Sequence, residues 1–175
     1  KKPFPFPWDL ITFMDTFPES VHLVPCPIED IEDDNNDYDL IILSYQVWFL
    51  SPSIPINSFL RDKQTQQILE NSKIITISGS RNMWFLAQEK IKTILKERQA
   101  KLVGYIALVD HTPNLVSAMT IVNWMFSGVK KRMFNLLPLP GISEKTIQES
   151  RRFGKIILNS IQNNNYSNLQ ENLIQ

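Results

Sequence analysis

The sequence predicts an open α/β fold, in which helices cover both faces of a parallel sheet. Three short apolar runs, at residues 38–44, 73–78 and 102–109, have the pattern of strands buried on both faces. A segment with apolar residues at three- and four-residue spacing follows each run, which is typical of an amphipathic helix. Strands that alternate with helices require crossover connections, and these produce a parallel sheet.

Four helices are expected around this sheet. The first covers residues 56–69, and the second follows residue 82. The third begins near Thr112 and Pro113, and the last is capped by Ser143. Apolar stripes are predicted to face the sheet; in the third helix the stripe is Leu115, Ala118, Met119, Val122, Met125 and Phe126. In the last helix Gly154 falls on the stripe with Ile147, Phe153, Ile157 and Ile161, so a close approach to the sheet is expected there.

The amino-terminal segment is an apolar arm rather than a strand. Pro3, Pro5 and Pro7 alternate with Phe4 and Phe6, and proline cannot donate a hydrogen bond inside a sheet. A short helix is expected at about residues 8–16, then a brief strand at residues 21–24. Two interpretations of the arm stay open: it packs over the core of its own domain, or it forms part of a partner surface or a ligand lid.

Length and composition predict one domain, residues 1–162, followed by a polar, frayed tail at residues 163–175. Lysine plus arginine and aspartate plus glutamate number 18 each, so no net field attracts nucleic acid. The single cysteine, Cys26, excludes an internal disulfide. The acidic residues 29–39 lack the spacing of an EF-hand, so no metal is expected. With no membrane span, a cytoplasmic protein is expected.

Open α/β sheets bind ligands beyond the carboxyl ends of their strands. The segments leaving the three predicted strands there are residues 45–52, 79–84 and 110–113. They carry aromatic rings, amides and a glycine, which suit a flat aromatic ligand with a polar edge. The candidate residues are Gln46, Val47, Trp48, Phe49, Gly79, Ser80, Arg81 and Asn82. Alternatively, Trp48 and Phe49 only cover the end of the sheet.

Two stretches give these segments a family resemblance. YDLIILSYQVWFLSPSIPINSFLRD resembles the third strand and following loop of the flavodoxin-like superfamily, which includes the FMN-dependent NAD(P)H-quinone reductases. KIITISGSRNMWFLAQEKI resembles the fourth strand and its loop. The segments FPFPWDLITFMDTFPES, IALVDHTPNLVSAMTIVNWMFSG and LPLPGISEKTIQESRRFG look most like flavodoxin-like proteins known as dialkylresorcinol-condensing enzymes, which accompany ketosynthases. The resemblance runs from Pro3 to about Ile161.

The resemblance implies an FMN site. Gln46, Val47, Trp48 and Phe49 would line the isoalloxazine ring, and Gly79, Ser80, Arg81 and Asn82 would form the second flavin loop. The chain departs from the quinone reductases at Gln46, where those proteins tend to have proline.

A larger departure lies at the start of the chain. Flavodoxin-like domains begin with a strand, a loop that binds the FMN phosphate, and a helix. This sequence begins with the proline-rich arm instead, so the phosphate site is assigned to no residue. In the strand order of the family, the absent strand would lie beside residues 38–44. These residues are therefore expected to form an apolar edge, covered by residues that precede Lys1 in the natural protein, by a partner chain or by the arm.

Two functions follow. The first is an FMN-dependent oxidoreductase that passes hydride from NAD(P)H to a quinone or an aromatic, polyketide-type intermediate, as a possible homodimer. His111 is a weak candidate for a proton donor, and otherwise a loop histidine beside a helix cap. The second is a flavin-free scaffold, or a condensing or cyclising partner of a ketosynthase. Residues 130–132 would then meet an acidic carrier protein, unless this basic run is only solvated. A hydrolase is not supported, because Ser78-Gly79-Ser80 lacks the nucleophile-elbow spacing.

Overall fold

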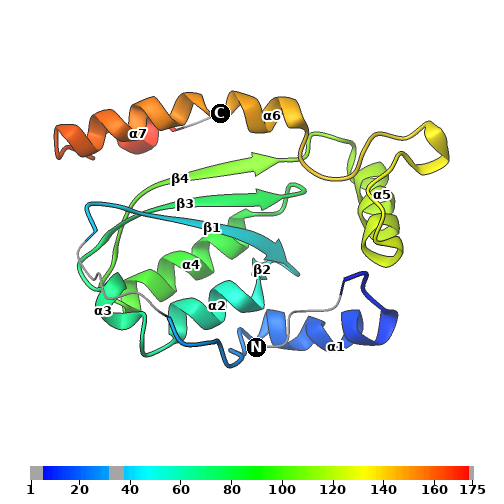
Figure 1. Ribbon diagram of the computed structural model, residues 1–175, viewed down its shortest axis with the longest axis horizontal. Helices are drawn as coiled ribbons and strands as arrows, with labels where there is room; N and C mark the ends of the chain where they lie inside the picture. The colour runs from blue at the N-terminus through cyan, green and yellow to red at the C-terminus, as the bar shows by residue number, and fades with distance from the viewer. Residues whose placement is uncertain (1–5, 32–37, 174–175) are drawn as a thin grey trace.

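The computed structural model describes residues 6–31 and 38–173, and in them an open four-stranded sheet lies between layers of helices (Figure 1). The strand order is β2-β1-β3-β4. Strands β1 (Ile41–Trp48), β3 (Lys73–Ser80) and β4 (Lys101–Val109) are parallel, and the two-residue β2 (Ser51–Pro52) runs antiparallel to β1. The predicted α/β class is confirmed.

The helices up to residue 162 occupy the positions that the sequence pattern gives them, with changed boundaries, and α8 lies within the predicted tail. Their bounds are α1 Leu10–Val21, α2 Ile54–Arg61, α3 Gln66–Leu69, α4 Phe85–Glu97, α5 Asn114–Ser127, α6 Glu144–Glu149, α7 Arg152–Gln162 and α8 Leu169–Asn172, with a 3-10 turn at Met133–Asn135.

One face of the sheet packs on α2 and α4. Ala87, Ile91, Ile94 and Leu95 of α4 are buried there, as their spacing predicts. They meet a core formed by Leu43, Tyr45, Leu60, Leu69 and Ile74. Burying a side chain of this size contributes about 1.5–3 kcal/mol, so this layer carries much of the stability of the fold.

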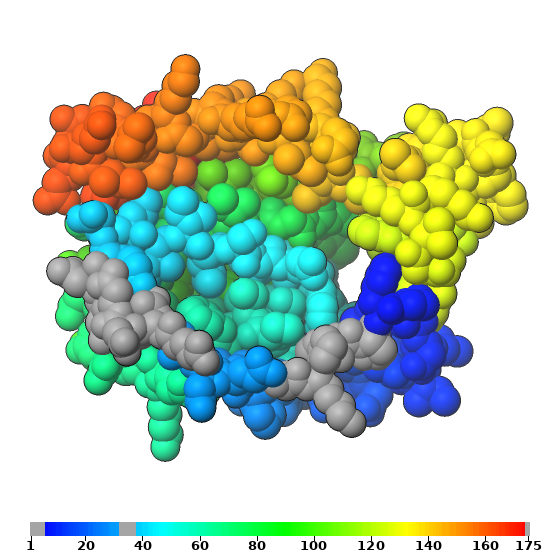
Figure 2. Space-filling model, in the orientation of Figure 1, coloured from blue at the N-terminus to red at the C-terminus, as the bar shows by residue number. Residues whose placement is uncertain are grey.

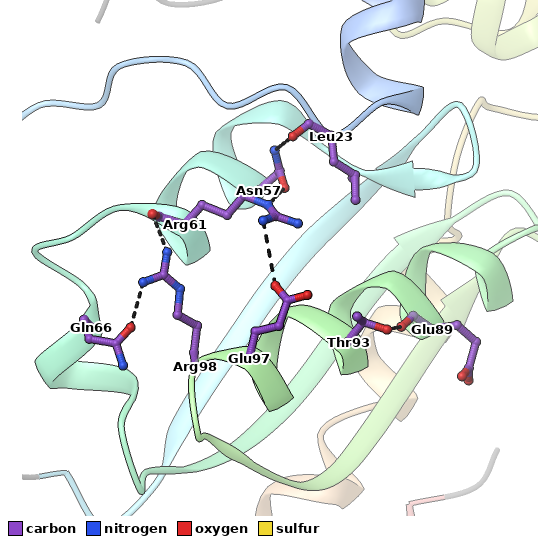
Figure 3. Close-up of polar contacts among 8 residues, drawn as sticks. All are labelled: Leu23, Asn57, Arg61, Gln66, Glu89, Thr93, Glu97 and Arg98. Atoms are coloured by element: carbon purple, nitrogen blue, oxygen red, sulfur yellow. Dashed lines mark hydrogen bonds and ion pairs between the residues drawn. The ribbon is translucent and has the colours of Figure 1, made fainter.

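Polar contacts at the rim of this layer fix α2, α3 and α4 to one another (Figure 3). Asn57 donates a hydrogen bond from Nδ2 to the Leu23 carbonyl, at 2.8 Å. Arg98 donates to the Gln66 side chain at 2.7 Å and to the Arg61 carbonyl. The Arg61 guanidinium lies 3.8 Å from the Glu97 carboxylate, an exposed ion pair that stabilises the fold by less than about 1 kcal/mol.

The other face packs on α7 and α8. Phe153 and Ile157 of α7 join Leu169 and Leu173 over Ile75 and Ile106. The expectation of a frayed tail is therefore wrong for the described residues up to 173. The tail returns because Leu169 and Leu173 are apolar at helical spacing and β4 needs cover.

The side chain of Gln170 also occupies the free edge of β4. Its Oε1 accepts a hydrogen bond from the Tyr105 amide at 2.6 Å, and its Nε2 donates to the Tyr105 carbonyl at 3.3 Å. One amide side chain thus satisfies both backbone groups of an edge residue, in place of a further strand.

Several predicted boundaries are wrong for local reasons. Helix α1 continues through Pro18 to Val21, so no strand forms at residues 21–24. The helix predicted at residues 56–69 divides at Asp62, which has extended backbone, and the Thr65 hydroxyl donates to the Phe59 carbonyl across the break. The last predicted helix divides into α6 and α7. Gly154 is exposed with open space around it, so it makes no close approach to the sheet.

Strand β1 is longer than predicted, because Tyr45, Gln46, Val47 and Trp48 continue it instead of forming a loop. Phe49 and Leu50 then make a tight turn with positive φ angles of 50° and 60°, and β2 returns along β1. Non-glycine residues seldom adopt this conformation, so tertiary contacts must hold it.

The expected apolar edge is present along β1. Among the described residues, only β2 pairs with this edge, through Val47 and Trp48. The neighbouring face is also bare: Ile42 is 53% exposed, and Ser44 and Gln46 are exposed beside it, because α7 and α8 lie over β3 and β4.

Helix α5 reverses the expected pattern of burial. Its buried residues are Ser117 and Thr120, while Leu115, Met119 and Val122 of the predicted core stripe are exposed. The polar side faces inward because the Ser117 hydroxyl donates to the Asp110 carboxylate at 2.6 Å.

Two sequence-based expectations fall wholly or partly outside the described residues: the extended conformation of residues 3–5, and the solvated acidic segment at residues 29–39, of which residues 32–37 are not described. Across the described part of the chain, no helix has the length and apolarity needed to cross a membrane.

Candidate functional site

The carboxyl ends of the three parallel strands lie at one edge of the sheet. Gln46 of β1 pairs with Gly79 of β3, and Gly79 pairs with Leu108 of β4, so the three strands reach this edge in register. The Asp110 amide continues the β3–β4 pairing by donating to the Ser80 carbonyl at 3.0 Å. The sequence prediction that these strand ends converge is correct.

The first predicted segment lies beneath the amino-terminal arm. The Trp48 ring packs edge-on against Trp8, with centroids 5.5 Å apart, and its Nε1 donates to Gln46 Oε1 at 3.2 Å. Phe49 lies between Phe13 at 5.1 Å and Phe17 at 5.0 Å. The described part of the arm therefore packs over its own domain, as one of the two interpretations expects.

These contacts leave the four residues of the first segment in different situations. The half-buried ring of Phe49 packs against Phe13 and Phe17, and these contacts hold the strained turn. Val47 and Trp48 are half-buried, and Gln46 is exposed on the bare face of β1. Gln46 and Trp48 are thus the members of this group that a ligand could reach.

The second predicted segment is shorter than expected, because Gly79 and Ser80 still belong to β3. A Cβ atom on Gly79 would lie 3.3 Å from the Ile142 Cδ1, so a side chain from residues 138–146 rests on this strand end. The Ser80 hydroxyl is buried and has no hydrogen-bond partner among the described residues. Arg81 is half-buried, and the exposed Asn82 donates from Nδ2 to the Asn114 Oδ1 at 2.5 Å.

A cavity of about 510 Å³ opens at the end of β4. His111 lines it, together with Lys130 and Arg132 from the segment that follows α5. Pro138, Leu139, Gly141 and Ile142 provide its apolar wall, and Ser143, Glu144 and Thr146 border it from the start of α6.

Asp110 is the most enclosed polar group of this cavity, at 7% exposure. Its Oδ1 accepts a hydrogen bond from the Thr112 amide at 2.9 Å, and its Oδ2 accepts from Ser117. Both oxygens are engaged, so this carboxylate fixes the loop and the start of α5. His111, the candidate proton donor, is exposed beside it.

The predicted residues therefore form two groups. Gln46 and Trp48 lie at the end of β1, near the arm, and His111 lies in the cavity at the end of β4. Gly79 links the two groups through Ile142. The sequence reasoning missed the wall formed by residues 138–142, because their irregular apolar pattern does not indicate which strand they cover.

A buried polar network lies next to Gln46 in the sequence, at Tyr45 of β1. The Tyr45 hydroxyl donates to Gln88 Oε1 at 2.8 Å, and the Thr76 hydroxyl donates to the same oxygen at 3.1 Å. Burial raises the pKa of Tyr45 well above its ordinary value, since the phenolate would lose its hydration. Gln88 Nε2 has no partner among the described residues.

No cluster of three or more histidine, cysteine, aspartate or glutamate side chains that could hold a metal occurs within residues 6–31 and 38–173. Together the strand ends, the aromatic turn and the cavity describe an open α/β protein with a candidate ligand edge. No family model, curated protein or solved structure matches the chain.

Proposed function

We propose that the chain is a flavodoxin-like protein that binds the ring of FMN at the carboxyl edge of its sheet. The register of β1 and β3 carries this proposal, because it sets Gln46 directly opposite Gly79. Two segments of the chain resemble flavin loops, and this register makes one residue of each a neighbour of the other. The mostly parallel sheet with helices on both faces is compatible with this superfamily.

The residues at this edge fit a flavin ring in part. Gln46 offers an exposed amide, and the half-buried Trp48 offers ring surface for stacking. The Ser80 hydroxyl lacks a partner, and a polar group of the ring could satisfy it. Phe49 fits less well, because Phe13 and Phe17 already enclose it. No phosphate site is assigned, so binding would depend on the ring.

FMN, when bound, would supply the hydride chemistry, taking hydride from NAD(P)H for a quinone or an aromatic, polyketide-type acceptor. The chain would orient the ring and exclude water from it. The cavity at the end of β4 would admit the acceptor beside Ile142, and His111, the candidate proton donor, lines the same cavity.

Titration of the flavin-free protein with FMN and with riboflavin tests this proposal. Because only ring contacts are assigned, both flavins should bind with affinities within about threefold, and their fluorescence should fall. Trp48→Ala should weaken binding about fivefold, the equivalent of about 1 kcal/mol of stacking.

Trp84→Ala is the matched control, since Trp84 packs on Tyr105 at 5.5 Å and belongs to neither group. It should leave both affinities unchanged. A protein that binds neither flavin would contradict the proposal, and so would equal losses in the two variants.

The alternative is a flavin-free scaffold, or a condensing or cyclising partner of a ketosynthase. The observation that favours it is the arm, whose aromatic rings already cover the turn that would meet the flavin. A ketosynthase, an acidic carrier protein or a second copy of the chain would then be its partner. Failure of flavin binding together with capture of purified ketosynthase would support this alternative.

A further inference from the structure

We propose that α5 and the segment after it, residues 129–139, dock on an anionic lipid bilayer. This is a binding property independent of flavin. We call these residues the basic apolar surface. Figure 2 shows this part of the chain in yellow, as a projection at one end of the molecule, away from α7.

Protruding apolar side chains are the first support for this proposal. Phe134 is 79% exposed and Leu136 is 84% exposed, and Val129 and Leu139 are about half exposed. Leu115 of α5 is a further exposed apolar residue, at 75% exposure. Several large apolar residues exposed within one short segment indicate a partner that removes them from water.

The local backbone presents these side chains outward. Phe134 and Asn135 both have positive φ angles, of 53° and 55°. Asparagine tolerates this conformation, whereas a bulky residue such as Phe134 seldom adopts it, so the backbone is strained at Phe134. None of residues 133–136 is buried, so no packing within the described chain explains the outward position of Phe134 and Leu136.

Charge is the second and independent support. Lys130, Lys131 and Arg132 are exposed, and residues 111–143 contain no aspartate or glutamate. The bordering acids are Asp110, which is buried and hydrogen-bonded, and the exposed Glu144. No ion pair found among the described residues involves the three cations, and Lys130 Nζ lies 5.3 Å from the centroid of the Trp124 ring.

These two properties together favour a bilayer over a protein. A chain with equal numbers of acidic and basic residues places three exposed cations and the exposed apolar Val129, Phe134, Leu136 and Leu139 in one short segment. Anionic headgroups attract such cations, and the boundary with the acyl chains accepts separate apolar side chains without a matching shape. A protein partner would instead need a surface complementary to each protruding side chain.

Vesicle flotation of the full chain tests the proposal. The probes are vesicles of phosphatidylcholine alone and vesicles that also contain about 30 mol% phosphatidylglycerol. The second kind has a negative surface potential similar to that of a cytoplasmic leaflet. We expect binding to the anionic vesicles, weakened at least tenfold by a rise from low salt to about 0.5 M salt, where charges are strongly screened. Neutral vesicles should bind little.

Two variants separate charge from apolar contact. Replacing Lys130, Lys131 and Arg132 together by Gln should weaken binding about 100-fold, or about fivefold for each cation. Phe134→Ser with Leu136→Ser should weaken it at least tenfold while leaving circular dichroism unchanged, because both side chains are already exposed.

Matched controls lie on α7, at the other end of the molecule. Leu158→Ser removes a half-exposed leucine, and Lys155→Gln removes an exposed cation. Neither should change binding. The proposal is overturned if the chain fails to float with anionic vesicles at low salt, or if the α7 variants weaken binding as much. Binding to an acidic carrier protein but not to vesicles would also overturn it.

Discussion

The hydroxyl group of Tyr45 shows how one buried residue links the core to the candidate site. Tyr45 lies in β1, one residue before Gln46, and its buried hydroxyl donates a hydrogen bond to Gln88 Oε1 in the core. Because the neutral phenol is buried and the phenolate is disfavoured, the folded state keeps this proton when the unfolded state loses it.

Tyr45→Phe should therefore change the pH dependence of stability. The raised pKa of Tyr45 in the folded protein contributes stability in full below the ordinary tyrosine pKa of about 10. This contribution is lost as pH rises from there toward the folded pKa. The variant should lose about 1 kcal/mol at pH 7, through the lost hydrogen bond, and should show a shallower fall in unfolding free energy above pH 10.

Urea denaturation at pH 7 and at pH 10.5 measures this difference. Tyr38→Phe serves as the control, since Tyr38 belongs to neither buried apolar cluster. Equal slopes above pH 10 in the wild-type protein and Tyr45→Phe would contradict the prediction.

At the scale of elements, the return of α8 onto β4 depends on a missing side chain. A Cβ atom on Gly104 would lie 2.7 Å from Leu173 Cδ1, closer than side chains pack. Glycine at this position thus lets Leu173 approach the strand. Leu173 and Leu169 together cover Ile106.

Gly104→Ala should destabilise the fold by about 1–3 kcal/mol, through overpacking against Leu173. Leu173→Ala should also destabilise it, but the double variant should lose clearly less than the sum, because the shortened side chain makes room for the new methyl group. Thermal unfolding of the four proteins measures this coupling. Additive losses would show that the two residues do not interact.

Gly154→Ala is the matched substitution on α7. Nothing lies within 4 Å of its Cβ position, so alanine should stabilise the protein by about 0.5–1 kcal/mol through helix propensity alone.

The bounds of a strand could be predicted best from the sequence where helices cover both faces of that strand. The continuous apolar runs identified β3 and β4 almost to the residue, because both faces of each strand are covered. The predicted strand at residues 38–44 ends four residues before β1 does, because Ser44 and Gln46 are exposed on a face that the described helices leave bare. The prediction that the apolar stripe of α5 packs on the sheet is wrong for the same reason. Periodicity shows that one face of a helix is apolar, but it does not show that another element covers that face.

The candidate site was predictable only in its position. Parallel strand ends meet at one edge, so Gln46 and Gly79 could be placed together from topology. Contacts made by irregular segments could not be foreseen, among them Ile142 over Gly79 and Phe13 against Phe49. Such segments carry no periodic pattern that identifies their neighbours.

At the scale of the molecule, α1 closes the ligand edge as a separate unit. Its Phe13 lies among aromatic rings of the arm, of the turn after β1 and of α5: Trp8, Phe49 and Phe126 lie 6.1, 5.1 and 5.9 Å from it. The Trp8 amide adds a hydrogen bond to the Met125 carbonyl at 2.9 Å.

Phe13→Ala should therefore release α1 without unfolding the sheet. We expect amide hydrogen exchange in α1 to accelerate about 10- to 100-fold, while α4 stays protected, because the lost contacts join α1 to the rim alone. Met14→Ala, at a mostly exposed position of the same helix, should leave exchange unchanged. Faster exchange throughout α4 would show that α1 and the core unfold as one unit.

The placement of the four tryptophans at the rim has a spectroscopic consequence. Trp8 and Trp48 contact each other, Trp84 follows β3, and Trp124 lies in the helix after β4. None belongs to α7 or α8. Tryptophan fluorescence therefore reports the arm, the strand ends and α5, whereas circular dichroism reports the whole chain. Opening of the rim would appear as an emission change with no matching loss of helix signal, which separates local opening from global unfolding in one titration.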